Sequence, residues 1–227
     1  MTTTQLVDLY GHSGWALQNR LWRVTTDDTG ATDAVVEYTY NEAGIKVKAF
    51  SYDTPDGGET KQNEVTKIFL IDSYNHTGYA QVLEEWSPSG SHPDVTYTIG
   101  DDVVSQSDSV GVRHLLYDGQ GSTRQLVDNN EDVKDAYSYD GYGVMLTGNP
   151  TSASPAATSL LYTGEYFDTD MQQYYLRARW YDQQTGRFNR MDPFGGNNHD
   201  PLSWDYSGQQ GTGCPSKKNL DYHRIFF

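Results

Sequence analysis

The sequence predicts an all-β protein in which repeated antiparallel hairpins form an open, curved sheet with little helix. Three observations predict this class. Glycine and tyrosine are abundant, with 22 and 18 of 227 residues. The acids are 23 aspartates and 8 glutamates, and aspartate favours turns whereas glutamate favours helix interiors. A turn motif also recurs along the chain, with β-branched and aromatic residues on both sides of it.

Composition limits the classes of function. The formal net charge is −15, hydrophobic residues make up 36% of the chain, and the mean hydropathy is −0.73. No apolar run approaches the ~20 residues that cross a bilayer. A strongly acidic chain does not suit a nucleic-acid binder held by its charge. The single cysteine, Cys214, excludes an internal disulfide and a cysteine-cluster metal site.

The turn motif is Tyr, then Asn or Asp, then two residues and Gly. It begins at Tyr40, Tyr74, Tyr117 and Tyr139, in a stretched form at Tyr181, and in weaker forms at Tyr97 and Tyr162. A single copy reads as an ordinary β-turn. Copies at a spacing of about 21 residues over most of the chain instead predict a repeated strand–turn–strand unit.

Each unit has the same expected structure. A strand leads to the Tyr, the Asn or Asp starts the turn, Gly supplies a positive φ, and a second strand follows. The expected strands are 35–40, 45–50, 67–72, 79–85, 95–99, 113–117, 123–128, 135–139, 160–163 and 173–181. We expect 35–40 to lie at an edge of the sheet, and 147–158, which is small, polar and proline-containing, to be a loop.

The spacing of these motifs resembles the YD repeats of the RHS family. Residues 115–128 are similar to a late repeat of that family, and 137–193 are similar to its RHS repeat-associated core. The residues that carry the resemblance are Tyr117, Asp118, Gly121, Tyr139, Asp140, Gly143, Tyr175, Arg177, Arg179, Tyr181, Asp182, Gly186, Arg187, Phe188 and Pro193.

The resemblance implies a division into a lead-in (1–34), YD repeats (35–136), the core (137–196) and a divergent tail (197–227). In the family, repeats wind into a hollow shell, the core closes one end, and a C-terminal effector lies inside. The expected partners are therefore the remaining repeats of a longer chain or a paired toxin-complex subunit. The implied location is extracellular or at the cell surface, although the start of the chain has no signal-peptide pattern.

Some members of the family cut themselves after the core with two aspartates, one acting as base and the other as acid. The first aspartate corresponds to Asp192, before Pro193. Met191 stands where the family has arginine, and Arg190 lies one place earlier. A second Asp-Pro-x-Gly is not found downstream. We therefore expect a non-catalytic chain and keep an aspartyl autoprotease as an alternative.

One run has two interpretations. In a continuous strand over 173–181, the side chains of Tyr175, Arg177, Arg179 and Tyr181 share one face. This face is either a structural ladder of stacked guanidinium and aromatic groups, or a contact for an enclosed cargo or an acidic ligand.

No cofactor or metal is expected. Asp128, Asn130 and Asp132 have the spacing of a calcium loop, but Val133 and Tyr139 occupy the positions that require Gly and Glu. A further alternative function is an aromatic-rich β-surface that binds glycans or a partner cell surface.

Overall fold

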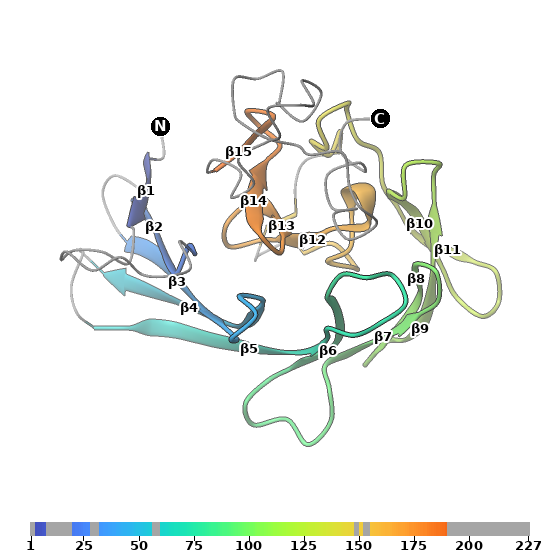
Figure 1. Cartoon of the computed structure of the whole chain (residues 1–227), viewed down its shortest axis with the longest axis horizontal. Helices are drawn as coiled ribbons and strands as arrows, with labels where there is room; N and C mark the ends of the chain where they lie inside the picture. Colours follow the sequence, from blue (N-terminus) through green and yellow to red (C-terminus); the bar gives the residue numbers. More distant parts are fainter. Residues whose placement is uncertain are drawn as a thin grey trace, which may run out of the picture. The chain divides into compact units, whose positions relative to one another are not determined.

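The computed structural model describes residues 3–7, 20–27, 32–55, 60–147, 150–151 and 155–189. Over these ranges the chain is nearly all β, and its one helical element is a single turn of 3-10 helix, η1 (Tyr162–Gly164). This confirms the predicted fold class (Figure 1). The first sheet contains β1 (Thr3–Val7), β2 (Arg23–Asp27), β3 (Thr32–Tyr40), β4 (Lys46–Pro55), β5 (Gln62–Asp72), β6 (Gln81–Trp86), β7 (Val95–Ile99), β8 (Val103–Asp108), β9 (Gly111–Tyr117), β10 (Thr123–Val127) and β11 (Val133–Ala136). The second contains β12 (Tyr166–Asp168), β13 (Gln173–Leu176), β14 (Arg179–Asp182) and β15 (Arg187–Phe188).

Strands follow one another in chain order within both sheets, from β1 to β11 and from β12 to β15. The pairs β2–β3, β3–β4, β9–β10 and β13–β14 are all antiparallel, as short turns between neighbours require. Strand β3 therefore lies between β2 and β4. The expectation that 35–40 forms an edge is wrong, because β1 and β2 precede it in the sheet.

The chain divides into two compact units. The first comprises residues 1–71, 82–97 and 107–110. Its described core contains Val24, Val36 and Tyr38, each less than 5% exposed. Lys46 is only 3% exposed, and its Nζ lies 5.2 Å from the ring centroid of Tyr38 and 5.0 Å from that of Phe69. The rings therefore solvate a buried ammonium group by cation–π contact.

The second unit comprises residues 72–81, 98–106 and 111–227. Its described core is a group of tilted aromatic rings centred on Tyr174, which is 1% exposed. The Tyr174 ring lies 5.0 Å from Phe167, 6.1 Å from Tyr162 and 6.5 Å from Tyr181, centroid to centroid. Tilted contacts at these distances are favourable for aromatic pairs, so this cluster is the main apolar core of residues 155–189.

Two of the predicted strands are wrong. Residues 160–163 form a single bridge, from Leu160 to Tyr166, and then the turn η1. The run 173–181 is a hairpin of β13 and β14, because Leu176 pairs with Arg179 and the chain reverses between them. Arg177 has a φ of 52°, a conformation that permits the tight turn although neither Arg177 nor Ala178 is a turn-forming residue type. Strands β1, β2, β8, β12 and β15 were not expected.

Candidate functional site

The Asp118 turn shows how the repeated motif works. The main-chain N–H of Asp118 donates to the carbonyl of Ser122 at 3.0 Å, and the N–H of Gly121 donates to the carbonyl of Asp118 at 3.0 Å. Carboxylate Oδ1 of Asp118 accepts from the N–H groups of Gln120 and Ser122. An Asn or Asp side chain thus satisfies two main-chain donors, and Gly121, with a φ of 82°, closes the turn.

The other copies repeat this geometry. Asn41 and Asp140 make the same main-chain bonds to Ile45 and Val144. The predicted positive φ at the motif glycines is confirmed for Gly44, Gly78, Gly121, Gly143 and Gly186. At Gly143 a side chain would be crowded, because an added Cβ would lie 2.5 Å from Cδ1 of Tyr162.

The segment 128–132 is a further copy that sequence reasoning missed. Oδ1 of Asp128 accepts from the N–H groups of Asn130 and Asp132, and Glu131 occupies the glycine position with a φ of 67°. This turn was not predicted because the segment lacks the Tyr and the Gly of the motif, although its Asp-Asn-Asn run is typical of turns. Its carboxylates therefore serve a main-chain turn, with Lys134 paired to Asp128 and Asp132.

Five of the motif tyrosines link their turn to an earlier part of the chain. Their hydroxyls donate to main-chain carbonyls: Tyr40 to Leu21, Tyr117 to Val103, Tyr139 to Thr123, Tyr162 to Gly141 and Tyr181 to Tyr142. Tyr97 instead donates to the Glu85 carboxylate, and Tyr74 is exposed. Burial raises the pKa of the Tyr139, Tyr162 and Tyr181 hydroxyls. These three hydroxyls therefore stay neutral and donate hydrogen bonds, so that each tyrosine links its motif to an earlier segment of the chain.

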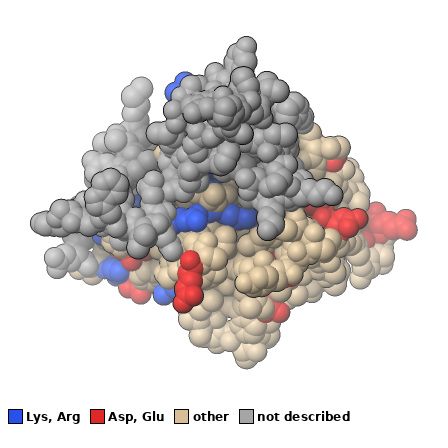
Figure 2. Space-filling view, viewed as in Figure 1, with Lys and Arg blue, Asp and Glu red and all other residues tan. Residues whose placement is uncertain are grey.

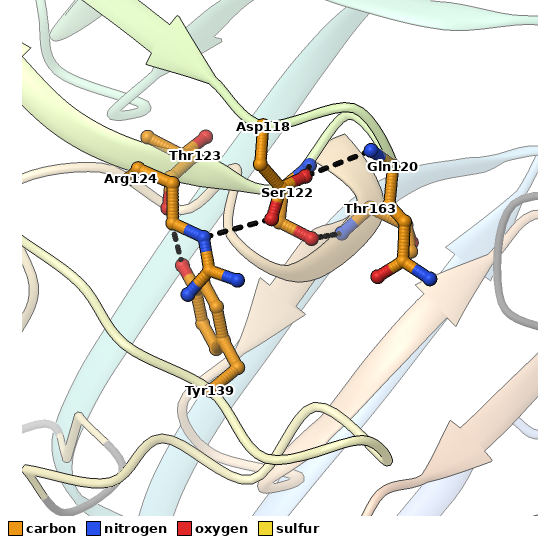
Figure 3. A network of polar contacts seen from close by, with 7 residues as sticks. All are labelled: Asp118, Gln120, Ser122, Thr123, Arg124, Tyr139 and Thr163. Atoms are coloured by element: carbon orange, nitrogen blue, oxygen red, sulfur yellow. Dashed lines mark hydrogen bonds and ion pairs between the residues drawn. The ribbon is translucent and has the colours of Figure 1, made fainter.

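Arg124 joins the turn to the aromatic core (Figure 3). Its Nε lies 2.7 Å from Oδ2 of Asp118, and its guanidinium lies 5.2 Å from the centre of the Tyr139 ring. Burial of the Asp118 carboxyl works to raise its pKa. Hydrogen bonds from the N–H groups of Ser122 and Gln120, and then from Arg124, outweigh that effect and lower the pKa.

Ser122 and Thr123 bind a later segment of the chain. Both are fully buried. Oγ of Ser122 accepts a 3.0 Å hydrogen bond from the N–H of Thr163, which has a φ of 53° (Figure 3). The hydroxyl of Thr123 donates to the carbonyl of Leu160 at 2.7 Å, and its N–H donates to the carbonyl of Leu161 at 3.0 Å. We call Ser122, Thr123 and residues 160–163 the docking seam.

Arg177 lies in a separate, partly buried cluster. Its Nη1 lies 2.7 Å from Oε2 of Glu165, its Nε donates to the carbonyl of Ala80 at 2.7 Å, and its guanidinium lies 4.4 Å from the Tyr79 ring centre. The hairpin turn removes the expected Arg–Tyr ladder, because Arg177 stands in the turn and Arg179 on β14. These contacts make Arg177 a structural link between 79–80 and Glu165.

The other residues that the sequence analysis singled out pack against aromatic rings, take part in a turn or lie at the surface. The buried Arg179 guanidinium lies 3.6 Å from the Phe188 ring centre, and Tyr175 packs against Trp180 at 5.0 Å. Oδ1 of Asp182 accepts from the N–H of Gln184 in the turn that Gly186 closes. Arg187 is exposed on β15. Asp192 and Pro193 lie outside the described residues.

Over the described residues, the side chains of the site bind main-chain N–H and carbonyl groups, and so hold segments of the chain in place. No group of three or more His, Cys, Asp or Glu side chains that could hold a metal ion occurs there. The same residues contain no helix long and apolar enough to cross a membrane. On the face drawn in Figure 2, acidic and basic side chains both reach the surface, and the acidic ones lie in separate groups.

No family model matches the chain. It is 41% identical over 81 residues to Salivary gland surface protein 1 of Aedes aegypti, which covers 35% of this chain and 2% of that protein. It is 26% identical over 195 residues to the tRNA3(Ser)-specific nuclease WapA of Bacillus spizizenii, which covers 83% of this chain and 7% of that protein. The chain thus spans a small part of these curated relatives.

Solved structures share the fold. The TcdB2-TccC3 crystal structure matches with a TM-score of 0.53 and 17% identity, over 79% of this chain and 9% of that chain. The TcdB2-TccC3-Cdc42 structure matches with a TM-score of 0.51 and 18% identity, over 94% and 10%. At these identities, the matches show that the fold is shared.

Proposed function

We propose that this chain is the structural end of an RHS-type repeat protein, that it helps to enclose or present a C-terminal effector, and that it catalyses no reaction itself. In this proposal 35–136 are YD repeats and 137–196 are the repeat-associated core. Residues 1–34 and 197–227 are a lead-in and a divergent tail.

The docking seam is the observation that carries the proposal. Ser122 and Thr123 belong to the last full motif before the proposed core, and they hold residues 160–163 through three hydrogen bonds. Buried hydrogen bonds of this kind are costly to leave unmade. A repeat that binds the main chain of the following segment gives that segment a fixed place, which a closing domain requires.

The described tyrosines favour this role over glycan binding. Tyr139, Tyr162, Tyr174 and Tyr181 are each at most 7% exposed, and their hydroxyls donate to main-chain carbonyls. A glycan-binding platform needs exposed ring faces and available polar groups, because sugars bind through both. These four tyrosines instead stabilise the fold from within.

The comparisons support a structural role without assigning an activity. WapA is named as a tRNA3(Ser)-specific nuclease, but the matched region is 7% of its length. We propose that any such activity belongs to an effector distinct from the repeats and core. The proposed partners are further YD repeats or a paired toxin-complex subunit, and the proposed location is extracellular or at the cell surface.

A protection assay tests the proposal. The chain is placed at the end of a YD-repeat array with a small reporter protein after Phe227, and the reporter is exposed to a protease. The proposal predicts that the reporter is digested much more slowly than the same reporter free in solution. Digestion at the free rate contradicts enclosure.

Two variants complete the assay. Ser122→Ala combined with Thr123→Val removes two hydrogen bonds of the docking seam and should restore fast digestion. Ser107→Ala changes an exposed serine of β8 and should leave protection intact.

Asp192→Asn tests self-cleavage. The proposal predicts one intact mass with and without this change. A fragment that disappears on Asp192→Asn would show an autoprotease.

A further inference from the structure

One face of strands β4 and β5 in the first unit combines exposed apolar and basic side chains. In the antiparallel register Lys48 is opposite Ile68, and Phe50 is opposite Thr66. Residues directly opposite share a face. Leu70 lies on the same face, two residues after Ile68. Ile68 is 40% exposed and Leu70 is 49% exposed. We call Lys48, Phe50, Lys61, Ile68 and Leu70 the basic-apolar patch.

The two lysines of the patch stand over aromatic rings. Nζ of Lys61 lies 4.0 Å from the Tyr52 ring centre and 4.7 Å from that of Phe50, and Nζ of Lys48 lies 5.8 Å from the Phe50 ring centre. Both side chains are exposed. Ring contacts hold the ammonium groups in position while water still reaches them.

The lack of a carboxylate partner distinguishes these lysines from four other described basic residues. The chain has 31 acidic and 16 Lys and Arg residues, and Arg23, Arg124, Lys134 and Arg177 all pair with carboxylates. In the described ranges, Lys48 and Lys61 pair with none. Two positioned cations without carboxylate partners, beside exposed aliphatic side chains, are complementary to a segment that carries both acids and apolar groups.

We propose that the basic-apolar patch docks an extended acidic peptide segment of a partner protein. Alternate side chains of an extended segment point the same way. Carboxylates on one part of the segment reach Lys48 and Lys61, and apolar side chains cover Ile68 and Leu70. This interaction is independent of effector enclosure, since it uses the first unit and none of the docking seam.

Binding to the full chain is measured with a fluorescent peptide in which every second residue is glutamate in one half and valine in the other, with serine at the positions between them, so that both kinds of side chain share one face. We expect saturable binding that weakens as salt increases, because salt screens exposed charges. Lys48→Glu combined with Lys61→Glu should weaken binding about tenfold or more, and Leu70→Ser should weaken it by a smaller factor.

The same strand supplies matched controls on the opposite face. Lys67 pairs with Ala49 and Val65 pairs with Ser51, and both are exposed. Lys67→Glu and Val65→Ser should leave the affinity unchanged. A urea midpoint equal to that of the unmodified chain shows that each variant is folded.

Four results would overturn the proposal. One is an absence of peptide binding, and another is equal loss in the Lys67→Glu control. Equal affinity for polyglutamate would show that the apolar side chains are not recognised. Self-association abolished by the double lysine variant would identify a second copy of this chain as the occupant.

Discussion

The hydroxyl of Tyr139 donates a 2.9 Å hydrogen bond to the main-chain carbonyl of Thr123, sixteen residues earlier. Thr123 in turn binds Leu160 and Leu161, so this tyrosine supports the residue that anchors the docking seam. A motif side chain thus fixes the preceding strand, and that strand fixes a later segment of the chain.

Tyr139→Phe should destabilise the fold by about 1–3 kcal/mol, because the buried Thr123 carbonyl loses a donor. Urea unfolding followed by circular dichroism measures the change. Tyr74 is 99% exposed, so Tyr74→Phe is the matched control and should change stability little. Equal effects of the two substitutions would show that the Tyr139 hydroxyl is not important.

Gly143→Ala should destabilise the protein by about 2 kcal/mol or more. The φ of 91° is unfavourable for a residue with a Cβ, and the new Cβ would press on the Tyr162 ring. Gly119 has nothing within 4 Å of its added Cβ. Gly119→Ala should be nearly neutral in the same thermal or urea unfolding experiment, and an equal loss would contradict this explanation.

Glu131→Gly should stabilise the protein by about 0.5–1 kcal/mol. Glu131 holds a φ of 67° at the glycine position of its turn, and glycine relieves that strain. Glu131→Ala keeps a Cβ and should give no gain. Unfolding free energies of the three proteins test this prediction, and equal stabilisation by glycine and alanine would attribute the effect to the lost charge.

Alkaline pH should unfold the second unit. Burial raises the pKa of Tyr162, Tyr174 and Tyr181 above the ordinary value of 10.0. The unfolded chain therefore loses these protons first. Their contribution to stability is complete below pH 10 and is lost as the pH rises from there toward the folded pKa values. Tyrosinate absorbance should then rise together with loss of the β-sheet signal. Ionisation of these tyrosines in an intact fold would contradict the assignment.

Local patterns were predictable from the sequence, and long-range contacts were not. The Asp118 and Asp140 turns follow from residues within five positions, so their glycine conformations were predicted, as were the two strands that flank Asp118. The strand expected over 135–139 is instead β11, and a single bridge from Tyr139 to Met145 flanks the Asp140 turn. The docking seam joins residues 37 and 41 positions apart, and no periodicity signals it. The turn at Arg177 was missed because neither of its two residues is glycine, asparagine or proline. Contacts with Glu165, Ala80 and Tyr79 hold Arg177 there.

The attachment of residues 160–163 to β10 is the structural basis of the proposed role, and amide hydrogen exchange measures it most directly. In Ser122→Ala combined with Thr123→Val, the N–H of Thr163 and the carbonyl of Leu160 lose their partners. Exchange over 159–168 should accelerate about tenfold or more, while β4 and the Ser107→Ala control stay unchanged. Unaltered protection of 159–168 in the double variant would contradict a core held by the repeats.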